Sequence, residues 1–394
     1  MRVGIITHFH GSTNCGGRLQ ALALCKVLNQ MNCSAEQLCY QIEGCILKKP
    51  SLRNRLAQIH LYQWLRRVYR LFKLIPEKPV PVTNDNPQKS RHVRELFEAW
   101  SNRYIPHSTS VYSNATIGNC AKDYDVLITG SDQVWNLNWY CPAFFLAFAP
   151  SSIHKISYAA SVCNDEYTKY QQKVVARHLA DFKAVSVREE ESVRVIEKLS
   201  PVSVEVTLDP TLLLERSDWD EFADERLVAE PYLFCYYLGN DPTERRLAQE
   251  YAAAHHLKVV VINQIDGWDV PEDRAFSDIA LDDITPGGFV SLIKHAECVF
   301  TDSFHGCVFS SIYRKNVFVF GRSGQASMSS RIHSVSGLFG FEDRFCNTPK
   351  KTTLNYIENC AAIDYEGHWQ QYETEKQKSI EFLRRNVFAG KDTK

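Results

Sequence analysis

The residues best suited to chemistry lie in a short polar segment, 301–306 (TDSFHG), that follows an apolar, strand-like run. Helically spaced apolar residues come next, so we predict a strand, a turn and a helix. Backbone N–H groups at a helix N-terminus bind anions, and His305 in the first turn would lie beside such an anion and exchange protons with it. The alternative is that Asp302 or Ser303 only caps the helix and that His305 is a surface residue.

Two other turns occupy the same kind of position. Residues 11–17 (GSTNCGG) join a predicted first strand to a predicted helix, and residues 129–136 (TGSDQVWN) follow another apolar run. In open α/β sheets, ligands bind outside the carboxyl ends of the strands, where these turns would lie. The first turn lacks the spacing of a dinucleotide-binding motif or a P-loop, so we infer no dinucleotide from it. A tight structural turn is the alternative interpretation.

Strands alternate with helices along most of the chain, which is typical of parallel α/β sheets. The predicted strands are 2–6, 124–128, 155–161, 184–187, 202–206, 232–237, 258–262, 298–300 and 317–320. The predicted helices are 18–28, 93–100, 167–182, one that ends at 199, 244–255, 288–295, 304–312 and one from 329.

The 394 residues favour two domains. We expect an N-terminal Rossmann-like domain at 1–215 with a helical insert at about 46–105. A C-terminal Rossmann-like domain would follow at 216–350, and a helical segment at 351–394 would pack back on the first domain.

Composition and charge narrow the class of protein. With 44% hydrophobic and 23% charged residues, the chain has enough apolar material for folded cores. The net charge of −1 gives no global attraction to nucleic acid. We find no signal-peptide pattern, no run of 18 apolar residues and no C-x-x-C pair among 13 cysteines, so we expect a reduced, cytoplasmic protein. No His/Cys/Asp spacing suggests a metal site.

The stretch 46–79 is strongly basic, with nine Lys or Arg residues against one acid, Glu77. Apolar residues recur between the arginines at spacings of three and four. This pattern predicts a basic amphipathic helix suited to an anionic membrane surface, and therefore peripheral association with the inner face of the cell membrane. The alternative is an ordinary surface helix with a solvated basic face.

Five segments, taken together and in order, resemble the polysaccharide pyruvyl transferase family. They are 14–21 (NCGGRLQA), 129–136 (TGSDQVWN), 186–189 (SVRE), 209–211 (DPT) and 301–306 (TDSFHG). The resemblance implies an α/β protein with two Rossmann-like domains of the GT-B type and an active site in the cleft between them. It also implies transfer of a pyruvyl group from phosphoenolpyruvate to a sugar or a lipid-linked oligosaccharide as a cyclic ketal. Such products belong to capsule or exopolysaccharide synthesis, and no cofactor is implied.

On this resemblance His305 is the expected acid/base, with Asp302 orienting it or capping the helix. Arg188 and Arg331 are expected to clamp the donor anions, because a guanidinium matches phosphate and carboxylate; an ordinary surface ion pair is the alternative for Arg188. Trp135 would stack on a sugar ring or would be a buried structural side chain. The other expected binding residues are Asn14, Gly16, Gly17, Ser131, Asp132 and Ser303.

The sequence departs from the family pattern at one point. Better-studied members carry Arg where this chain has Ser303, and Leu where it has Phe304. The anion contact must therefore come from another residue, or the donor binds in a different pose. Two other functions stay open: a GT-B glycosyltransferase that uses a nucleotide sugar, and a non-catalytic, membrane-peripheral carbohydrate-binding protein.

Overall fold

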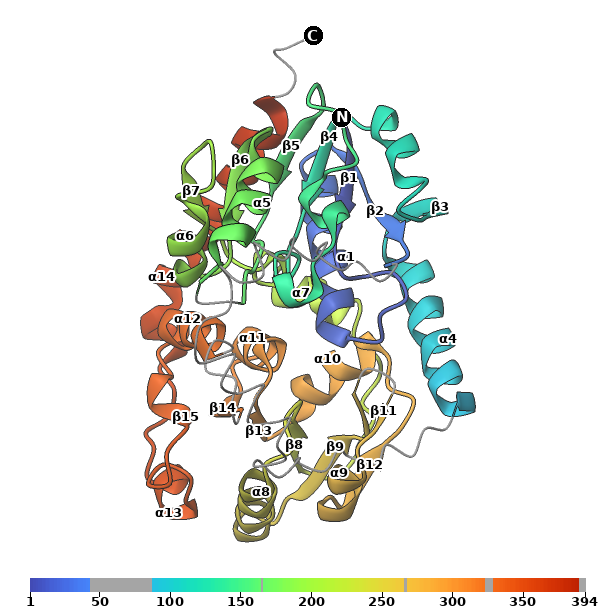
Figure 1. Ribbon diagram of the computed structural model, residues 1–394. Helices are drawn as coiled ribbons and strands as arrows, with labels where there is room; N and C mark the ends of the chain where they lie inside the picture. Colours follow the sequence, from blue (N-terminus) through green and yellow to red (C-terminus); the bar gives the residue numbers. More distant parts are fainter. Residues whose placement is uncertain (43–86, 164–165, 266–267, 323–328, 390–394) are drawn as a thin grey trace, which may run out of the picture.

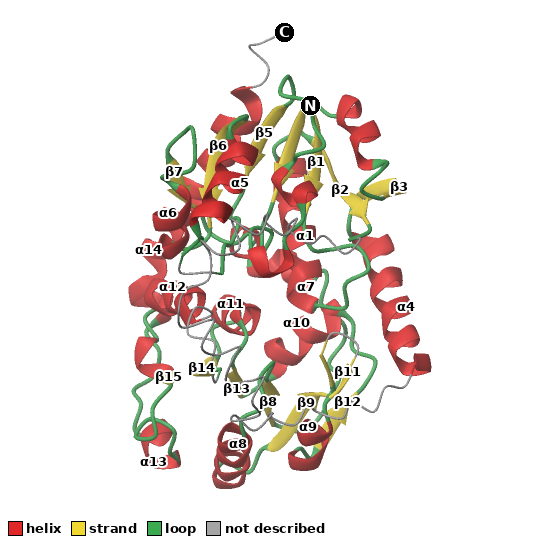
Figure 2. Ribbon diagram, viewed as in Figure 1, coloured by secondary structure: helices red, strands yellow, loops and turns green. Residues whose placement is uncertain are grey.

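Two parallel sheets, each flanked by helices, form the two halves of the protein (Figures 1 and 2). The computed structural model describes residues 1–42, 87–163, 166–265, 268–322 and 329–389. The predicted basic helix at 46–79 lies outside these residues, and its membrane role stays a prediction. Among the helices that the structure describes, none is long and apolar enough to cross a membrane.

The first sheet has the strand order β3-β2-β1-β4-β5-β6-β7. Its strands are β1 (Arg2–Ile6), β2 (Ser34–Tyr40), β3 (His107–Tyr112), β4 (Val126–Thr129), β5 (His154–Ser157), β6 (Phe182–Val187) and β7 (Val204–Val206). The helical elements of this half are α1 (Cys15–Gln30), α4 (Pro87–Tyr104), η1 (Ile117–Asp123), η2 (Leu137–Trp139), η3 (Pro142–Phe145), α5 (Lys169–Leu179) and α6 (Glu190–Ile196). The strand order reverses between β1 and β4, which opens a crevice at their carboxyl ends.

The second sheet repeats this plan with the order β12-β9-β8-β13-β14-β15. Its strands are β8 (Tyr232–Tyr236), β9 (Lys258–Ile262), β12 (Ile279–Leu281), β13 (Cys298–Thr301), β14 (Asn316–Phe320) and β15 (Phe345–Cys346), and a hairpin of β10 (Gln264–Ile265) and β11 (Trp268–Asp269) lies apart. The helical elements are α8 (Pro242–Ala254), α9 (Pro271–Phe276), α10 (Pro286–His295), α11 (Phe304–Ile312), α12 (Ser329–Phe339), η6 (Glu342–Arg344) and α13 (Leu354–Glu358). Here the order reverses between β8 and β13.

The predicted α/β fold with two Rossmann-like halves is confirmed. The strand at 258–262 and the helix at 304–312 fall where the sequence placed them. The strands β2, β3, β12 and β15 were not predicted. In β2, the apolar pattern is interrupted by Gln37, which is buried and donates from Nε2 to the Ala21 carbonyl at 2.9 Å.

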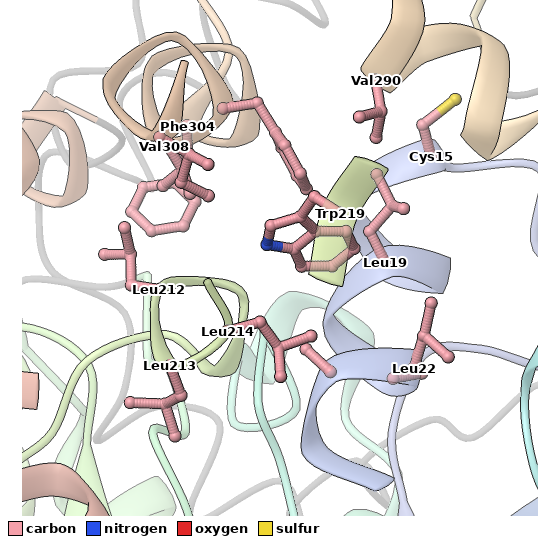
Figure 3. Packing of buried hydrophobic residues seen from close by; sticks show 14 of the residues in the cluster. Cys15, Leu19, Leu22, Leu212, Leu213, Leu214, Trp219, Val290, Phe304 and Val308 are labelled. Atoms are coloured by element: carbon pink, nitrogen blue, oxygen red, sulfur yellow. The ribbon is translucent and has the colours of Figure 1, made fainter. Parts of the chain in front are cut away.

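The two halves share one apolar core around Trp219, which lies on α7 (Arg216–Asp220) and is 0% exposed. Figure 3 shows its indole between side chains of α1, of η4 (Pro210–Leu213), of α10 and of α11. The indole N–H donates to the Thr211 carbonyl at 3.1 Å, and the ring packs edge-on against Phe309, 4.8 Å away. This packing holds the carboxyl ends of the two sheets toward each other.

The last helix, α14 (Tyr365–Phe388), contacts both halves. At its start, the Tyr365 hydroxyl donates to the Lys315 carbonyl, at 2.8 Å, in the second half. Further along, Ser379 accepts from the Leu208 N–H at 2.9 Å, and Arg385 pairs with Glu205 of β7 at 2.6 Å.

Candidate functional site

A cavity of about 500 Å³ lies between the two strand-order reversals. The first half contributes the loops after β1 and β4 and the start of α1, and the second half contributes the loops after β8, β13 and β14. Its lining residues from the first half are His8, Gly11, Ser12, Thr13, Asn14, Gly16, Asp132, Gln133 and Trp139. Those from the second half are Tyr236, Leu238, Ser303, Phe304, His305, Arg322 and Arg331.

His305 lies in the first turn of α11, as the sequence suggested, and its side chain is only 10% exposed. Its Nε2 has no hydrogen-bond partner among the described residues and lies 3.9 Å from Oδ2 of Asp209. The turn is built for this position, because Ser303 is the N-cap and its side chain accepts from the Gly306 N–H at 3.4 Å. The histidine is therefore held at the cavity wall, with a buried Nε2 that faces Asp209 and has no hydrogen-bond partner among the described residues.

Gly16, at the start of α1, lies so close to His305 that only a residue without a side chain fits there. A Cβ on Gly16 would lie 2.0 Å from His305 Nδ1, so any other residue would displace the imidazole. Asn14 caps α1 by accepting the Gly17 N–H at 2.9 Å. Thus the 11–17 turn brings the first half against the histidine of the second half.

Arg188 is buried and is not among the residues that line the cavity; its guanidinium lies 4.1 Å from the ring centre of Phe304, which does line it. It donates to Asp209 at 2.7 Å and to Asp132 at 3.4 Å. The predicted donor clamp is thus in the layer that supports the lining residues, and the alternative of an ordinary surface ion pair is wrong because this arginine and both of its partners are well covered.

Asp209, from the DPT segment, was not among the expected site residues, yet it lies against residues of three other motifs, Ser131, Arg188 and His305. It is 1% exposed, accepts from Ser131 Oγ at 3.0 Å and from the Thr211 hydroxyl at 2.6 Å, and pairs with Arg188. A carboxylate with this many donors is fixed in place. It therefore positions Arg188 and places a negative charge 3.9 Å from His305 Nε2.

Asp302 was expected to orient His305 or to cap α11, but its carboxylate bonds to other groups. Its carboxylate accepts the N–H groups of Leu238 and Gly239, both at 2.7 Å, and pairs with Arg322 Nε at 3.0 Å. The helix cap is Ser303. Asp302 thus ties β13 to the loop after β8, and the interpretation as a plain N-cap is wrong because its oxygens bond to that loop.

Three of the expected binding residues are buried and do not line the cavity. Trp135 is 0% exposed, donates from Nε1 to the Phe144 carbonyl at 3.2 Å and stacks on Phe145, so it is the structural tryptophan of the two alternatives. Ser131 is 0% exposed and bonded to Ala159 and Asp209. Gly17 is buried in α1. Asn14, Gly16, Asp132, Ser303, His305 and Arg331 do line the cavity.

Arg331 is the arginine among the expected clamps that reaches the cavity. It is 4% exposed, and its Nε has no hydrogen-bond partner among the described residues. The sequence did not single out Arg322, His8, Gln133 or Trp139, which also line the cavity. For His8 the usable signal was its position just after the first strand.

The charged groups around His305 shift its pKa in opposite directions. Burial lowers the pKa of His305 below its ordinary value, and Arg188 and Arg331 lower it too, while Asp209 and Asp132 raise it. Burial raises the pKa of Asp209 and of Asp132, but Arg188 and His305 outweigh burial and leave both carboxyls with lowered pKa values. At neutral pH the free site thus holds a neutral histidine, two carboxylates and two guanidinium groups.

The fold and the cavity define an α/β protein of the GT-B class, with its site between two Rossmann-like halves. A UDP-GlcNAc 2-epimerase from Methanocaldococcus jannaschii has a similar fold, with a TM-score of 0.51, 10% identity, and coverage of 98% of this chain and 100% of that one. A Listeria monocytogenes protein described as a UDP-N-acetylglucosamine 2-epimerase has a TM-score of 0.50 and 10% identity, over 95% and 90% of the two chains. These likenesses concern the fold alone.

The family model described as polysaccharide pyruvyl transferase matches residues 14–324. This chain therefore belongs to the polysaccharide pyruvyl transferase family. A comparison with curated proteins gave no match.

Proposed function

We propose that this protein transfers a pyruvyl group from phosphoenolpyruvate to two hydroxyl groups of a sugar in a polysaccharide precursor, with formation of a cyclic ketal. The observation that carries the proposal is that His305 and Arg331 line the same wall of the cavity, and that each has a buried side-chain nitrogen without a described partner. Phosphoenolpyruvate carries a phosphate and a carboxylate, and both match a guanidinium. The family membership supports the same reaction class.

The reaction joins a hydroxyl oxygen to C2 of the donor while C3 gains a proton. The C2–O bond to phosphate then breaks, phosphate takes the bonding electrons, and the second hydroxyl oxygen binds C2. Of the two hydroxyl protons, one replaces the proton delivered to C3 and the other leaves with hydrogen phosphate. We assign His305 the proton delivery to C3, a role for which histidine is suited near neutral pH.

A neutral histidine must first gain a proton to act as this acid. The donor supplies the reason, because its phosphate and carboxylate bring negative charge beside His305 and favour the imidazolium. Arg331 would bind these anions and so replace the arginine that other family members carry at the position of Ser303. Arg188 would contribute its charge from beside Phe304 while it fixes Asp132 and Asp209.

A nucleotide-sugar glycosyltransferase is the second candidate, since its fold class is the same. In the second half, however, Asp302 already takes the N–H groups of Leu238 and Gly239 in the loop after β8. A carboxylate at this position competes with a diphosphate for those donors. A non-catalytic binding protein is the third candidate, and a buried histidine with a shifted pKa beside two carboxylates argues against it.

The test is an assay of purified protein with phosphoenolpyruvate or with UDP-sugars. The acceptors are a panel of methyl glycosides of common pyranoses and a lipid-linked sugar extract. We expect phosphate release and a ketal mass on a glycan with phosphoenolpyruvate only. Glycosyl transfer from a UDP-sugar would instead support the second candidate, and glycan binding without turnover of either donor would support the third.

A further inference from the structure

The two walls of the cavity differ in charge. Its described arginines, Arg322 and Arg331, both come from the second half. The wall from the first half presents hydroxyl, amide and backbone groups, one carboxylate at Asp132, one imidazole at His8 and one indole at Trp139. A surface without Lys or Arg but with many hydrogen-bonding groups suits a polyhydroxyl compound better than an anion.

Trp139 is unusual among the tryptophans that line or support this region, because it is 61% exposed at the cavity. Its backbone is nevertheless held by a hydrogen-bonded turn. Asn136 accepts the Asn138 N–H at 3.1 Å and the Trp139 N–H at 3.0 Å, and its Nδ2 donates to Gln133 Oε1 at 3.1 Å. An exposed indole on a backbone held in this way can stack on the apolar C–H face of a pyranose ring.

His8 has a defined tautomer. Its Nε2 lies 3.4 Å from the Gln133 carbonyl oxygen, and since a carbonyl can only accept, Nε2 carries the proton. Nδ1 is then the acceptor nitrogen. Burial lowers the pKa of His8, with Asp132 and the Gln133 carbonyl opposing it, so the ring is neutral near pH 7. A neutral imidazole with Nδ1 unprotonated has the form that a general base requires.

We propose that the wall formed by His8 and Trp139 is the acceptor subsite, in which a pyranose ring stacks on Trp139 and Nδ1 of His8 takes the proton of the attacking hydroxyl. This proposal rests on the proposed function. The hydroxyl oxygen forms its bond to C2 of phosphoenolpyruvate while its proton passes to His8. His305, on the opposite wall, supplies the proton to C3 in the same addition.

His8→Gln separates the base from the structural contact, because the glutamine Nε2 can still donate to the Gln133 carbonyl while no basic nitrogen remains. With phosphoenolpyruvate and the methyl glycoside that the wild type modifies, we expect kcat to fall about a hundredfold. We also expect the acid limb of the pH–kcat profile that reports His8 to disappear. The affinity for phosphoenolpyruvate alone, measured by calorimetry, should be unchanged.

Trp139→Ala should raise the KM for the glycoside about three- to tenfold, the size expected from one aromatic contact, with little change in kcat. Trp139→Phe should restore most of the affinity. Val111→Ala is the matched control, because Val111 is 55% exposed and is not among the cavity-lining residues. Thermal melts confirm that each variant is folded, and His8→Asn replaces His8→Gln if the latter does not fold.

The outcomes separate the subsite from the function. Full kcat and an unchanged acid limb in folded His8→Gln, or an unchanged glycoside KM in Trp139→Ala, would overturn the subsite while pyruvyl transfer stands. A wild-type protein that binds no phosphoenolpyruvate and forms no ketal would overturn the proposed function, and the subsite with it.

Discussion

The two strand-order reversals of this protein have the same topology and different chemistry. In the second half, Asp302 closes the reversal by accepting two backbone N–H groups of the loop after β8 and by pairing with Arg322. In the first half, the corresponding loop runs from His8 to Asn14 and faces the cavity. The second reversal is thus held by a carboxylate and an arginine, while the first is held by neutral groups, since Gln20 Oε1 accepts the Ser131 N–H at 3.1 Å and the Thr7 hydroxyl donates to the Ser131 carbonyl at 2.9 Å.

The comparison shows how one fold plan can serve two purposes. Asp302 of the second reversal immediately precedes the N-cap of α11 and so helps to position His305, while the loop from His8 to Asn14 in the first reversal adds uncharged polar groups to the cavity wall. We therefore expect substitution of His305 to affect turnover, and substitution of Asp302 to affect the free energy of unfolding.

The largest expected effect is on turnover. His305→Gln should reduce kcat at least about a hundredfold, because the glutamine amide cannot deliver a proton to C3. The donor affinity and the melting temperature should stay close to those of the wild type. Wild-type turnover in a folded variant would exclude the histidine from the mechanism.

Gly16→Ala tests the close approach between the two halves. The added Cβ would lie 2.0 Å from His305 Nδ1, so the imidazole must move. A displacement of about 1 Å in a reacting group can cost about a hundredfold in rate, and we expect a loss of kcat of that order. Gly118→Ala is the control, since a Cβ there would lie 3.7 Å from its nearest neighbour, the Phe148 carbonyl oxygen. Equal kcat values for the two variants would contradict the prediction.

Arg331→Ala should weaken phosphoenolpyruvate binding by about 1.5–3 kcal/mol, the scale of a charge-assisted hydrogen bond. Arg331→Lys should recover only part of this, because an ammonium lacks the bidentate geometry. Arg314→Ala serves as control, since Arg314 is paired with Glu366 outside this cavity. Calorimetry with unchanged donor affinity for Arg331→Ala would move the anion contact to another residue.

Donor binding should also depend on pH. The pKa of His305 is lowered in the free protein, and the anionic donor should raise it, so binding takes up protons between the two pKa values. The affinity should therefore fall as the pH rises through the pKa of the complex. Calorimetry in buffers of different ionisation enthalpy measures this uptake. An equal uptake by His305→Gln would assign it to the donor phosphate.

The smallest effect on turnover is expected for Asp302→Asn. An amide oxygen cannot replace both carboxylate oxygens, so one of the Leu238 and Gly239 N–H groups loses its acceptor. The free energy of unfolding should fall by about 1–3 kcal/mol, measured by urea denaturation, while kcat changes less than about threefold. A hundredfold loss of kcat at unchanged stability would instead give Asp302 the catalytic role first expected for it.

Local patterns predicted the parts of the site that depend on local structure. A strand, a polar turn and a helix are visible in 298–312, and so the position of His305 followed from sequence. Asp302 and Asp209 were harder to distinguish, because their partners come from segments far away in the chain. Asp302 bonds to the loop after β8, and Asp209 bonds to Ser131 and Arg188.

The tryptophans also show that tertiary contacts cannot be predicted from local sequence patterns. Trp135 and Trp139 lie four residues apart, yet one is 0% exposed and the other 61%. Periodicity does not separate them, because the segment forms a turn and the short helix η2 rather than one regular element. The burial of Trp135 depends on tertiary contacts, namely the stacking of Phe145 on its ring and the hydrogen bond from its indole N–H to the Phe144 carbonyl.

The course of α14 has a mechanical consequence. A stiff helix that is bonded near one end to Lys315 and near the other to Glu205 crosslinks the two halves without a covalent bond. Bending the molecule about the segment between the sheets would stretch these contacts, so large hinge motions are opposed. The width of the cavity between His8 and the opposite wall is then already set in the folded protein. A substrate that fits this cavity does not have to supply the free energy of bringing the two halves together.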